Sequence, residues 1–413
     1  MKRYIKELFL FVVLFGLTGC SMLETNTSLM APPTLPDTKE EILHAIEQYV
    51  PNSQELLIPL NDKRTNPIIM EDLDGDGKEE AIVFYKKKPG ILTGVVLKDM
   101  DGWKQWVTFD SGGKVLHDLK FFDLTGDGKK EVFIGTAYTK EYDSSRVLYV
   151  YQLDDEAERL LEEACHYFIT DDFGPTGPAL ILVTFNKGKN NTLTMYQTKD
   201  MKLTVTDTLA LDEYINGYEH LISGRITPST WGLMLDVGIG AHSGATFVIS
   251  IQNGRMENVF PHGEDDPTFK ASMTYSNDTN RDGILEFSVL EEPVVEKDLS
   301  HAEMPYITAY YQLTDAYEQH LVSKRFDNDT YNYQILLPLK WKNIKINMSD
   351  DWKYVEMIDA KTDQVLFDVY VSEIKRIEDD WTLLKETDQY VYLSKTVNEK
   401  NKHLFQFIHD SIE

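Results

Sequence analysis

Residues 71–80, EDLDGDGKEE, crowd acidic side chains into a short segment that contains two glycines. Counted from the first aspartate, carboxylates stand at positions 1, 3, 5 and 9, a glycine stands at position 6, and a main-chain carbonyl is available at position 7. The corresponding residues are Asp72, Asp74, Asp76, Glu80, Gly77 and Lys78. Ca²⁺ takes about 6–8 oxygen ligands, which a tight loop with alternating carboxylates can supply. The spacing predicts a calcium-binding loop, and the alternative is a solvated turn.

The pattern occurs twice more along the chain, in FFDLTGDGKKEVFIG and SNDTNRDGILEFSVL. The predicted ligands are Asp123, Thr125, Asp127, the carbonyl of Lys129 and Glu131 in the second loop, and Asp278, Asn280, Asp282, the carbonyl of Ile284 and Glu286 in the third. The second interval between loops is about three times the first, so two further units without acids are expected near residues 170 and 223. A repeat of about 50 residues predicts a propeller, solenoid or array. The first loop carries the most acids and is expected to be the most metal-dependent.

The residues that follow each loop argue against an EF-hand. An EF-hand needs a bidentate glutamate at position 12 and continues into a helix. Position 12 is Val83, Ile134 and Val289 here, within short β-branched and aromatic segments that are typical of strands. Each metal loop is therefore predicted to join two strands.

Four strand-like segments separated by turns fill the interval between the first two loops: PIIMED, EEAIVFYKK, ILTGVVLKDMD and GWKQWVTFDSG. Four strands per repeat are the plan of a β-propeller blade. Residues 52–326 resemble the FG-GAP/VCBS repeats of integrin α-subunits and of secreted bacterial proteins, a family whose calcium loops have the pattern D-x-[DN]-x-D-G-x-x-[DE]. The resemblance implies an all-β propeller of about five blades, with Ca²⁺ bound in a loop between two strands of a blade.

The N-terminus predicts export and attachment to a membrane. Residues 1–19 combine a basic start, a short apolar core and small residues, which is typical of a secretory signal. The sequence Leu17-Thr18-Gly19-Cys20 resembles the lipobox of bacterial lipoproteins, in which the cysteine is acylated. The resemblance implies a lipid anchor on Cys20 and an extracytoplasmic location on a Gram-positive cell membrane. The alternative is an ordinary signal with an incidental cysteine.

The remaining segments complete the expected domain organisation. Residues 20–37 are polar and contain prolines, which predicts a flexible tether. Residues 38–51 predict a short helix packed on the propeller, with one apolar stripe that ends before Pro51 and consists of Ile42, Leu43, Ile46, Tyr49 and Val50. Residues 327–413 predict a small α+β domain, in which alternating strands precede two helical stretches that include FQFIHDSIE. This region resembles the small domain that follows such repeats in some Firmicute lipoproteins.

Charge and cysteine content narrow the classes of partner. The formal net charge of −27 argues against binding to nucleic acid and against electrostatic attachment to anionic lipid. With Cys20 acylated, Cys165 has no partner for an intrachain disulfide, and it is expected to be a buried thiol on an inner strand.

Catalytic motifs are weak in this sequence. His242 and Ser243 in GIGAHSG lack the glycine framework of a nucleophile elbow, so a tight turn between strands is expected there.

The sequence favours a calcium-stabilised module that binds a protein or a cell-wall polymer, more than an enzyme. The alternatives are an envelope hydrolase and an accessory subunit of an envelope machine.

Overall fold

The computed structural model describes residues 37–408, except residues 52, 62, 63, 140–145, 262, 264, 298 and 374–379. The predicted signal, Cys20 and nearly all of the predicted tether lie outside these residues. The described chain forms six small antiparallel sheets and one short N-terminal helix. The prediction of an all-β fold with an N-terminal helix is confirmed.

The helix α2 spans Asp37–Tyr49 and ends two residues before Pro51. Its side chains Ile42, Ala45 and Ile46 are buried, whereas Leu43, which was expected to share the apolar stripe, is 37% exposed. The buried side chains recur three to four residues apart, as one helix face requires. One face of α2 therefore packs against the protein.

Sheets 1 and 2 each contain an acidic loop between two of their strands. Sheet 1 contains β1 (Leu56–Leu57), β2 (Ile69–Glu71), β3 (Glu80–Lys88), β4 (Ile91–Asp99) and β5 (Trp103–Gly112). Sheet 2 contains β6 (Val115–Phe122), β7 (Glu131–Ala137), β8 (Arg146–Leu153) and β9 (Ala157–Cys165). The four strands predicted for the first unit are confirmed.

Sheets 3 and 4 are the two units expected from spacing alone. Sheet 3 contains β10 (Tyr167–Asp172), β11 (Pro178–Asn186), β12 (Asn190–Lys199) and β13 (Lys202–Ala210), with the short 3₁₀ turn η1 (Gly174–Thr176) where sheets 1 and 2 carry an acidic loop. Sheet 4 contains β14 (Gly217–Arg225), β15 (Trp231–Ile239), β16 (Ser243–Gln252) and β17 (Arg255–Asn258). In sheets 2, 3 and 4 the strands pair in sequence order, as blade strands do.

Sheets 5 and 6 contain the C-terminal third of the chain. Sheet 5 contains β18 (Glu286–Glu291), β19 (Ile307–Leu313), β20 (Gln319–Asn328), β21 (Tyr333–Leu336) and β27 (Phe405–Phe407). Sheet 6 contains β22 (Ile344–Met348), β23 (Tyr354–Asp359), β24 (Val365–Ser372), β25 (Thr382–Glu386) and β26 (Val391–Ser394). The predicted domain boundary at residue 326 falls inside β20, and sheet 5 also takes two strands from beyond that residue.

The prediction of an α+β domain over residues 327–413 is wrong for the part that the structure describes. Its only helical element there is the short 3₁₀ turn η2 (Lys402–Leu404). The start of FQFIHDSIE is strand β27, which pairs with β21, and residues 409–413 lie outside the description. The physical reason is that Phe405 and Phe407 are two residues apart, so both fall on one face of a strand, where they pack into the core shared by sheets 5 and 6.

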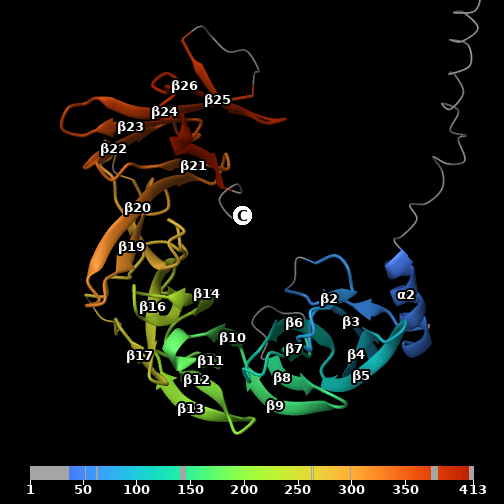
Figure 1. The fold of residues 1–413 in the computed structure, drawn as a ribbon. Helices are drawn as coiled ribbons and strands as arrows, with labels where there is room; N and C mark the ends of the chain where they lie inside the picture. Colours follow the sequence, from blue (N-terminus) through green and yellow to red (C-terminus); the bar gives the residue numbers. More distant parts are fainter. Residues whose placement is uncertain are drawn as a thin grey trace, which may run out of the picture.

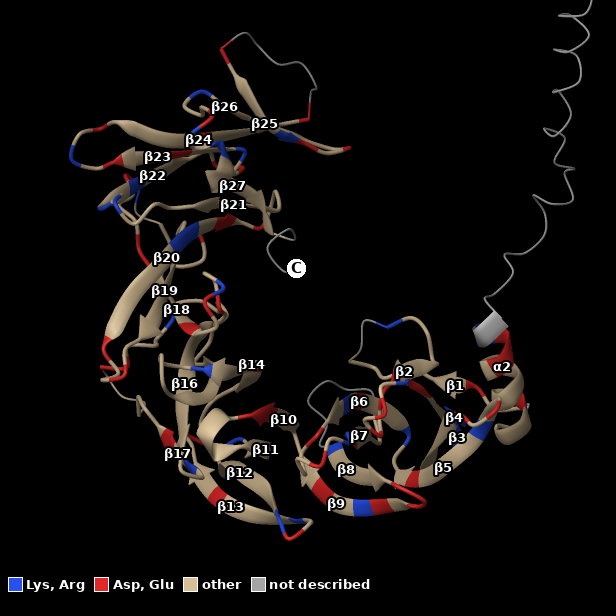
Figure 2. Cartoon of the chain, in the orientation of Figure 1, with Lys and Arg blue, Asp and Glu red and all other residues tan. Residues whose placement is uncertain are grey.

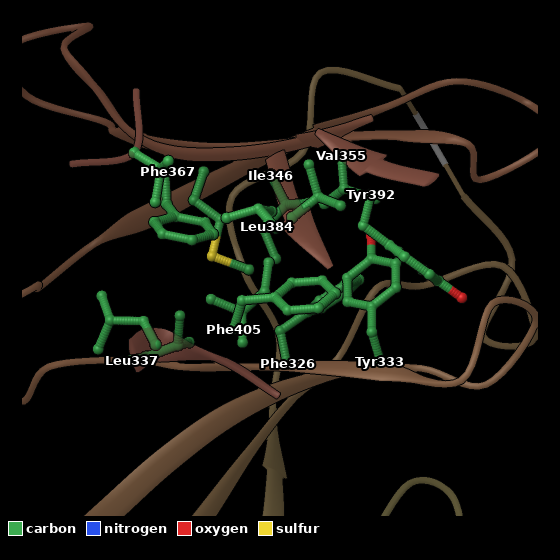
Figure 3. Close-up of a cluster of buried hydrophobic side chains, with 14 of the residues drawn as sticks. Phe326, Tyr333, Leu337, Ile346, Val355, Phe367, Leu384, Tyr392 and Phe405 are labelled. Carbon is green, nitrogen blue, oxygen red and sulfur yellow. The ribbon is translucent and has the colours of Figure 1, made fainter. Parts of the chain in front are cut away.

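Successive sheets pack face to face, and each pair shares a hydrophobic core. In β3, Ile82 and Phe84 face sheet 2, whereas Ala81, Val83 and Tyr85 face α2. Because alternate residues of a strand point to opposite faces, a strand between two neighbours must be apolar at every position. Figure 3 shows the last of these cores, where Phe326 and Tyr333 of sheet 5 meet Phe367 and Val355 of sheet 6.

The six sheets follow one another in an open arc, with α2 at one end and sheet 6 at the other (Figure 1). The outer face of sheet 1 is covered by α2, and the far face of sheet 5 is covered by sheet 6. Closing five blades into a ring would require these two faces to meet each other. The blades expected from the sequence are thus present, but α2 and sheet 6 take the places that ring closure needs.

A buried ion pair holds the long connection between sheets 4 and 5. Lys270 Nζ donates to Asp236 Oδ1 (2.6 Å), and neither side chain is exposed to solvent. The same carboxylate accepts hydrogen bonds from the hydroxyls of Thr246 (2.7 Å) and Ser276 (2.8 Å). Lys270 Nζ also donates to the carbonyl of Thr274 (2.6 Å). Both charged groups therefore have further hydrogen-bond partners within the protein.

Candidate metal centres

Each acidic loop ends at the first residue of a buried strand. The position-9 glutamates Glu80, Glu131 and Glu286 begin β3, β7 and β18, and none is more than 1% exposed. The first two loops follow β2 and β6, and the third follows Asn277, which forms an isolated bridge with Glu286. The prediction that the loops join strands, and not helices, is confirmed.

The first aspartate of each loop fixes the loop backbone. In the first loop, the N–H groups of Gly75 and Gly77 donate to the two oxygens of Asp72 (2.9 and 3.0 Å). In the second, Asp123 accepts from Gly126 and Gly128 (2.7 and 2.9 Å). These loop glycines have positive φ, which glycine adopts without the strain of a Cβ.

The third loop has a closely related arrangement. Asp278 accepts hydrogen bonds from the N–H groups of Asp282 (3.1 Å) and Gly283 (2.8 Å). The N–H of Ile284 then donates to Asp282 Oδ1 (2.9 Å), as that of Lys78 does to Asp76 (2.8 Å) and that of Lys129 to Asp127 (2.9 Å). The three loops therefore share one backbone design despite their different sequences.

The position-9 glutamate is tied to the beginning of its loop. Its Oε2 accepts the position-2 N–H, from Leu73 at Glu80 (2.9 Å) and from Thr279 at Glu286 (2.6 Å). Burial raises the pKa of both carboxyls, and it raises that of Glu286 to about 7. The nearby Asp278 carboxylate acts in the same direction on Glu286. A cation would relieve this repulsion.

Two of the loops gather oxygen donors closely enough to hold an ion. In the first, one oxygen from each of Asp72, Asp74 and Glu80 lies within 4.8 Å of the others. In the third, the same holds for Asp278, Asp282 and Glu286, whereas Asn280 donates its amide to Asp282 Oδ2 (3.1 Å). An all-oxygen donor set with several carboxylates fits Ca²⁺. These acidic clusters could bind a metal ion.

The second loop does not gather its carboxylates in this way, although all of its residues belong to the described part of the chain. The Thr125 hydroxyl donates to Glu131 Oε1 (3.0 Å), so threonine at position 3 satisfies the buried glutamate directly. The side chain of Lys129 is paired with Asp154. The second loop is stabilised by these contacts within the chain.

One side chain that we did not predict from the sequence reaches into each loop from the neighbouring strand. Glu286 is directly opposite Gln312 in the β18–β19 ladder. Continuing the β3–β4 and β7–β8 ladders by one residue places Lys98 opposite Glu80 and Gln152 opposite Glu131. The same cross-strand position is therefore occupied by lysine in the first unit and by glutamine in the other two.

In the first loop, Lys98 lies among the predicted ligands. Its Nζ is bonded to Asp74, and it lies 3.1 Å from Asp76 Oδ2 and 3.7 Å from Glu80 Oε1. Burial lowers the pKa of Lys98, but the hydrogen bonds to Asp74 and Asp76 outweigh it, so the pKa is held above its ordinary value. The ammonium supplies positive charge where the sequence predicted calcium. The expectation that the first loop depends most on metal therefore has to allow for a cation that the chain itself provides.

The first two loops also pack against each other. A Cβ at Gly75 would lie 2.4 Å from the carbonyl oxygen of Gly128, so no larger residue fits there. Lys130 pairs with Glu71, and its N–H donates to the carbonyl of Leu73 (2.8 Å). The two loops form one contact between sheets 1 and 2, whereas the third loop is held by Arg225 of sheet 4, which donates to the carbonyls of Asp282 and Gly283.

Ser243 and Cys165 have structural and not catalytic surroundings. Ser243 begins β16 directly after the turn from β15, and its hydroxyl donates to the carbonyl of Ile239 (2.6 Å). The prediction of a tight turn there is confirmed. Cys165 is buried at the end of the outer strand β9 and not on an inner strand, and burial raises the pKa of its thiol to about 12.

Comparison with known proteins identifies no family. No protein-family model matches the sequence, and no curated protein matches it. Solved structures with partial similarity include a rhamnogalacturonan lyase of Bacillus licheniformis (14% identity, 73% of this chain, 70% of that chain, TM-score 0.33). A second is the exotype rhamnogalacturonan lyase YesX (12% identity, 73% of this chain, 71% of that chain, TM-score 0.26).

A third is an endo-1,5-α-L-arabinanase of Thermotoga petrophila (8% identity, 83% of this chain, 97% of that chain, TM-score 0.21). TM-scores this low carry no conclusion about this chain. Within the described residues, no helix has the length and apolar character needed to cross a bilayer.

Proposed function

We propose that this protein is a calcium-stabilised lipoprotein, anchored through Cys20 at the extracytoplasmic side of the membrane, whose sheets form a binding module for a protein or a cell-wall polymer. The observation that supports the calcium part is the third loop. There, three carboxylates converge, and one of them, Glu286, is fully buried with a raised pKa. Such a cluster is unfavourable until a cation neutralises it.

Calcium in this loop would have a structural role. Asp278 and Asp282 lie in the long connection from sheet 4, and Glu286 begins β18 of sheet 5. An ion bound to all three would tie the connection to the strand that follows it. The acidic character is not confined to the loops, since Figure 2 shows Asp and Glu along the whole arc.

Calcium should raise the melting temperature of the folded protein. Extracellular calcium modules bind at about 10⁻⁴–10⁻³ M, and at ten times the dissociation constant one site adds roughly 1.4 kcal/mol by mass action. Melting should be followed in excess chelator and in millimolar calcium, with Asp278→Asn as the test variant and Asp200→Asn, in the turn between β12 and β13, as the control. Identical wild-type curves under both conditions would contradict calcium binding in the third loop.

The anchor can be tested separately, by replacing Cys20 with serine in the full-length chain. Serine cannot form the thioether that carries the lipid, and stable anchoring requires more than one acyl chain. The variant should therefore be recovered unprocessed or as a secreted soluble form, whereas the wild-type protein should fractionate with membranes and incorporate labelled fatty acid. Unchanged lipid labelling of the Cys20→Ser protein would contradict the proposed anchor.

A further inference from the structure

We propose that one cross-strand side chain decides which acidic loop accepts calcium: Lys98 closes the first loop to the ion, whereas Gln312 leaves the third loop open. This inference rests on the proposed function, in which calcium binds in the third loop. It concerns a position that the loop motif does not contain. Lys98 lies on β4 and Gln312 lies on β19. Each is opposite the position-9 glutamate of its loop.

The first loop holds an ammonium group within its donor set. Nζ of Lys98 contacts carboxylates at positions 3, 5 and 9, which are three of the four predicted side-chain ligands. The ammonium also lies 5.5 Å from the centroid of the Trp106 ring, and the lysine side chain is 20% exposed. These contacts hold the ammonium on the carboxylates and away from bulk solvent.

A lysine at this position opposes calcium in two ways. It has three N–H donors and no acceptor, so it cannot become a ligand. Its positive charge would also lie only a few ångströms from the ion and would repel it. Calcium could enter only if Lys98 left Asp74, Asp76 and Glu80 together.

Glutamine at the same position has the opposite consequences. The Gln312 amide lies 2.9 Å from Asp282 Oδ2 and 3.3 Å from Glu286 Oε1, so it contacts two of the three carboxylates that would hold the ion. It is neutral, and its amide carries a carbonyl oxygen, which is a ligand type that Ca²⁺ accepts. Rotation of the amide would exchange a donor for this oxygen. Gln312 therefore adds no positive charge among the carboxylates of the third loop and offers it an additional ligand.

The second loop separates the effect of glutamine from that of the carboxylates. Gln152 Nε2 lies 3.3 Å from Asp127 Oδ2, in the position that Gln312 has in the third loop. The carboxylates of this loop do not converge; Thr125 donates to Glu131, and Lys129 pairs with an aspartate outside the loop. Glutamine is thus permissive, but it does not create a site without a convergent set of acids.

The test exchanges the two side chains in the full-length protein. The variants are Lys98→Gln and Gln312→Lys, and the number of bound calcium ions per chain is measured by equilibrium dialysis, together with melting in calcium and in chelator. Lys98→Gln should add one bound ion per chain, and Gln312→Lys should remove the ion of the third loop. Each ion at ten times its dissociation constant should multiply the folded-to-unfolded ratio about elevenfold.

Two controls separate charge from position. Lys104→Gln removes a lysine that is directly opposite Lys98 in the β4–β5 ladder but bonds the carbonyl of Met100, so it should leave the calcium count unchanged. Lys98→Arg keeps the positive charge and should keep the first loop closed.

If Lys98→Gln folds only when calcium is present, that dependence also supports the proposal, because the four acids have then lost their internal counter-charge.

The outcomes distinguish this inference from the proposed function. Wild-type protein that binds no calcium, combined with a Lys98→Gln protein that binds one ion, would contradict calcium at the third loop and support the role of Lys98. Wild-type protein whose calcium is lost on Asp74→Asn would overturn the inference and leave the proposed function in place. An unchanged calcium count in both Lys98→Gln and Gln312→Lys would also overturn it.

Discussion

Replacing Asp236 with asparagine is expected to destabilise the protein by about 3–5 kcal/mol, the largest loss that we expect from a single substitution in this chain. The substitution keeps the shape of the side chain but removes its charge. Lys270, which is completely buried and bonded to Asp236, would then be a buried cation that has lost its bonded counter-ion. The loss should be measured as a change in the free energy of unfolding by denaturant titration at neutral pH.

The effect of Asp236→Asn should also depend on pH. Burial raises the pKa of Asp236, but the hydrogen bond from His220 and the charge of Lys270 lower it by more, so the pKa lies below its ordinary value. A depressed carboxyl pKa contributes stability above the pKa of the unfolded chain, about 3.9, and this contribution is lost as pH falls toward the folded value. The difference between variant and wild type should therefore shrink below about pH 4.

An exposed ion pair supplies the control for this prediction. Lys297 and Asp350 are 2.8 Å apart, but their side chains are 67% and 95% exposed. Because such pairs contribute about 0–1 kcal/mol, Asp350→Asn should change stability little. Equal losses for Asp236→Asn and Asp350→Asn would show that the buried pair does not hold the connection between sheets 4 and 5.

Shortening Ile46 to alanine should give the second large effect, a loss of about 2–5 kcal/mol. Ile46 is 5% exposed and packs, with Ile42 and Ala45, on the outer face of sheet 1. Removing its side-chain atoms leaves a cavity over an apolar face that none of the described sheets covers. Denaturation should be followed in the full chain, since sheets in a stacked array depend on their neighbours and sheet 1 can open before the rest.

Leu43→Ala is the matched control on the same helix. Both substitutions lower side-chain volume alike and have similar effects on helix propensity, but Leu43 is 37% exposed. Its replacement should change stability by well under half the amount lost with Ile46→Ala. A comparable loss from both substitutions would mean that α2 acts through its own helicity and not as a cover for sheet 1.

The role of α2 explains why the array can remain open. Stacked repeats need a terminal element that covers the apolar face of the last unit. At the N-terminal end, α2 covers Ala81, Val83 and Tyr85 of β3, and at the other end sheet 6 covers sheet 5. The sequence showed an amphipathic helix, but it did not show which face of which sheet the helix would cover.

Much of the fold could be predicted from local patterns. The acidic loops were located because Asp72, Asp123 and Asp278 begin the same run of acids and glycine, and this run needs only neighbouring residues. The strands after them were recognisable as continuous apolar runs, since sheets packed on both faces admit few polar side chains. Even the two units without acids followed from the spacing. Within the described residues, the prediction of C-terminal helices was wrong, because alternation over a segment as short as Phe405–Phe407 is a weak signal.

The sequence alone thus determined which segments are strands and where oxygen donors gather, because both depend on residues close together in the chain. Only the tertiary structure decided what lies opposite those donors. Lys98, Gln152 and Gln312 follow their position-9 glutamates at different distances along the chain, since the connections between the paired strands differ in length and register shifts occur in β3–β4. No fixed spacing marks this cross-strand position. Pairing across the sheet brings an ammonium to one set of carboxylates and an amide to another, and that contact sets the charge of each loop.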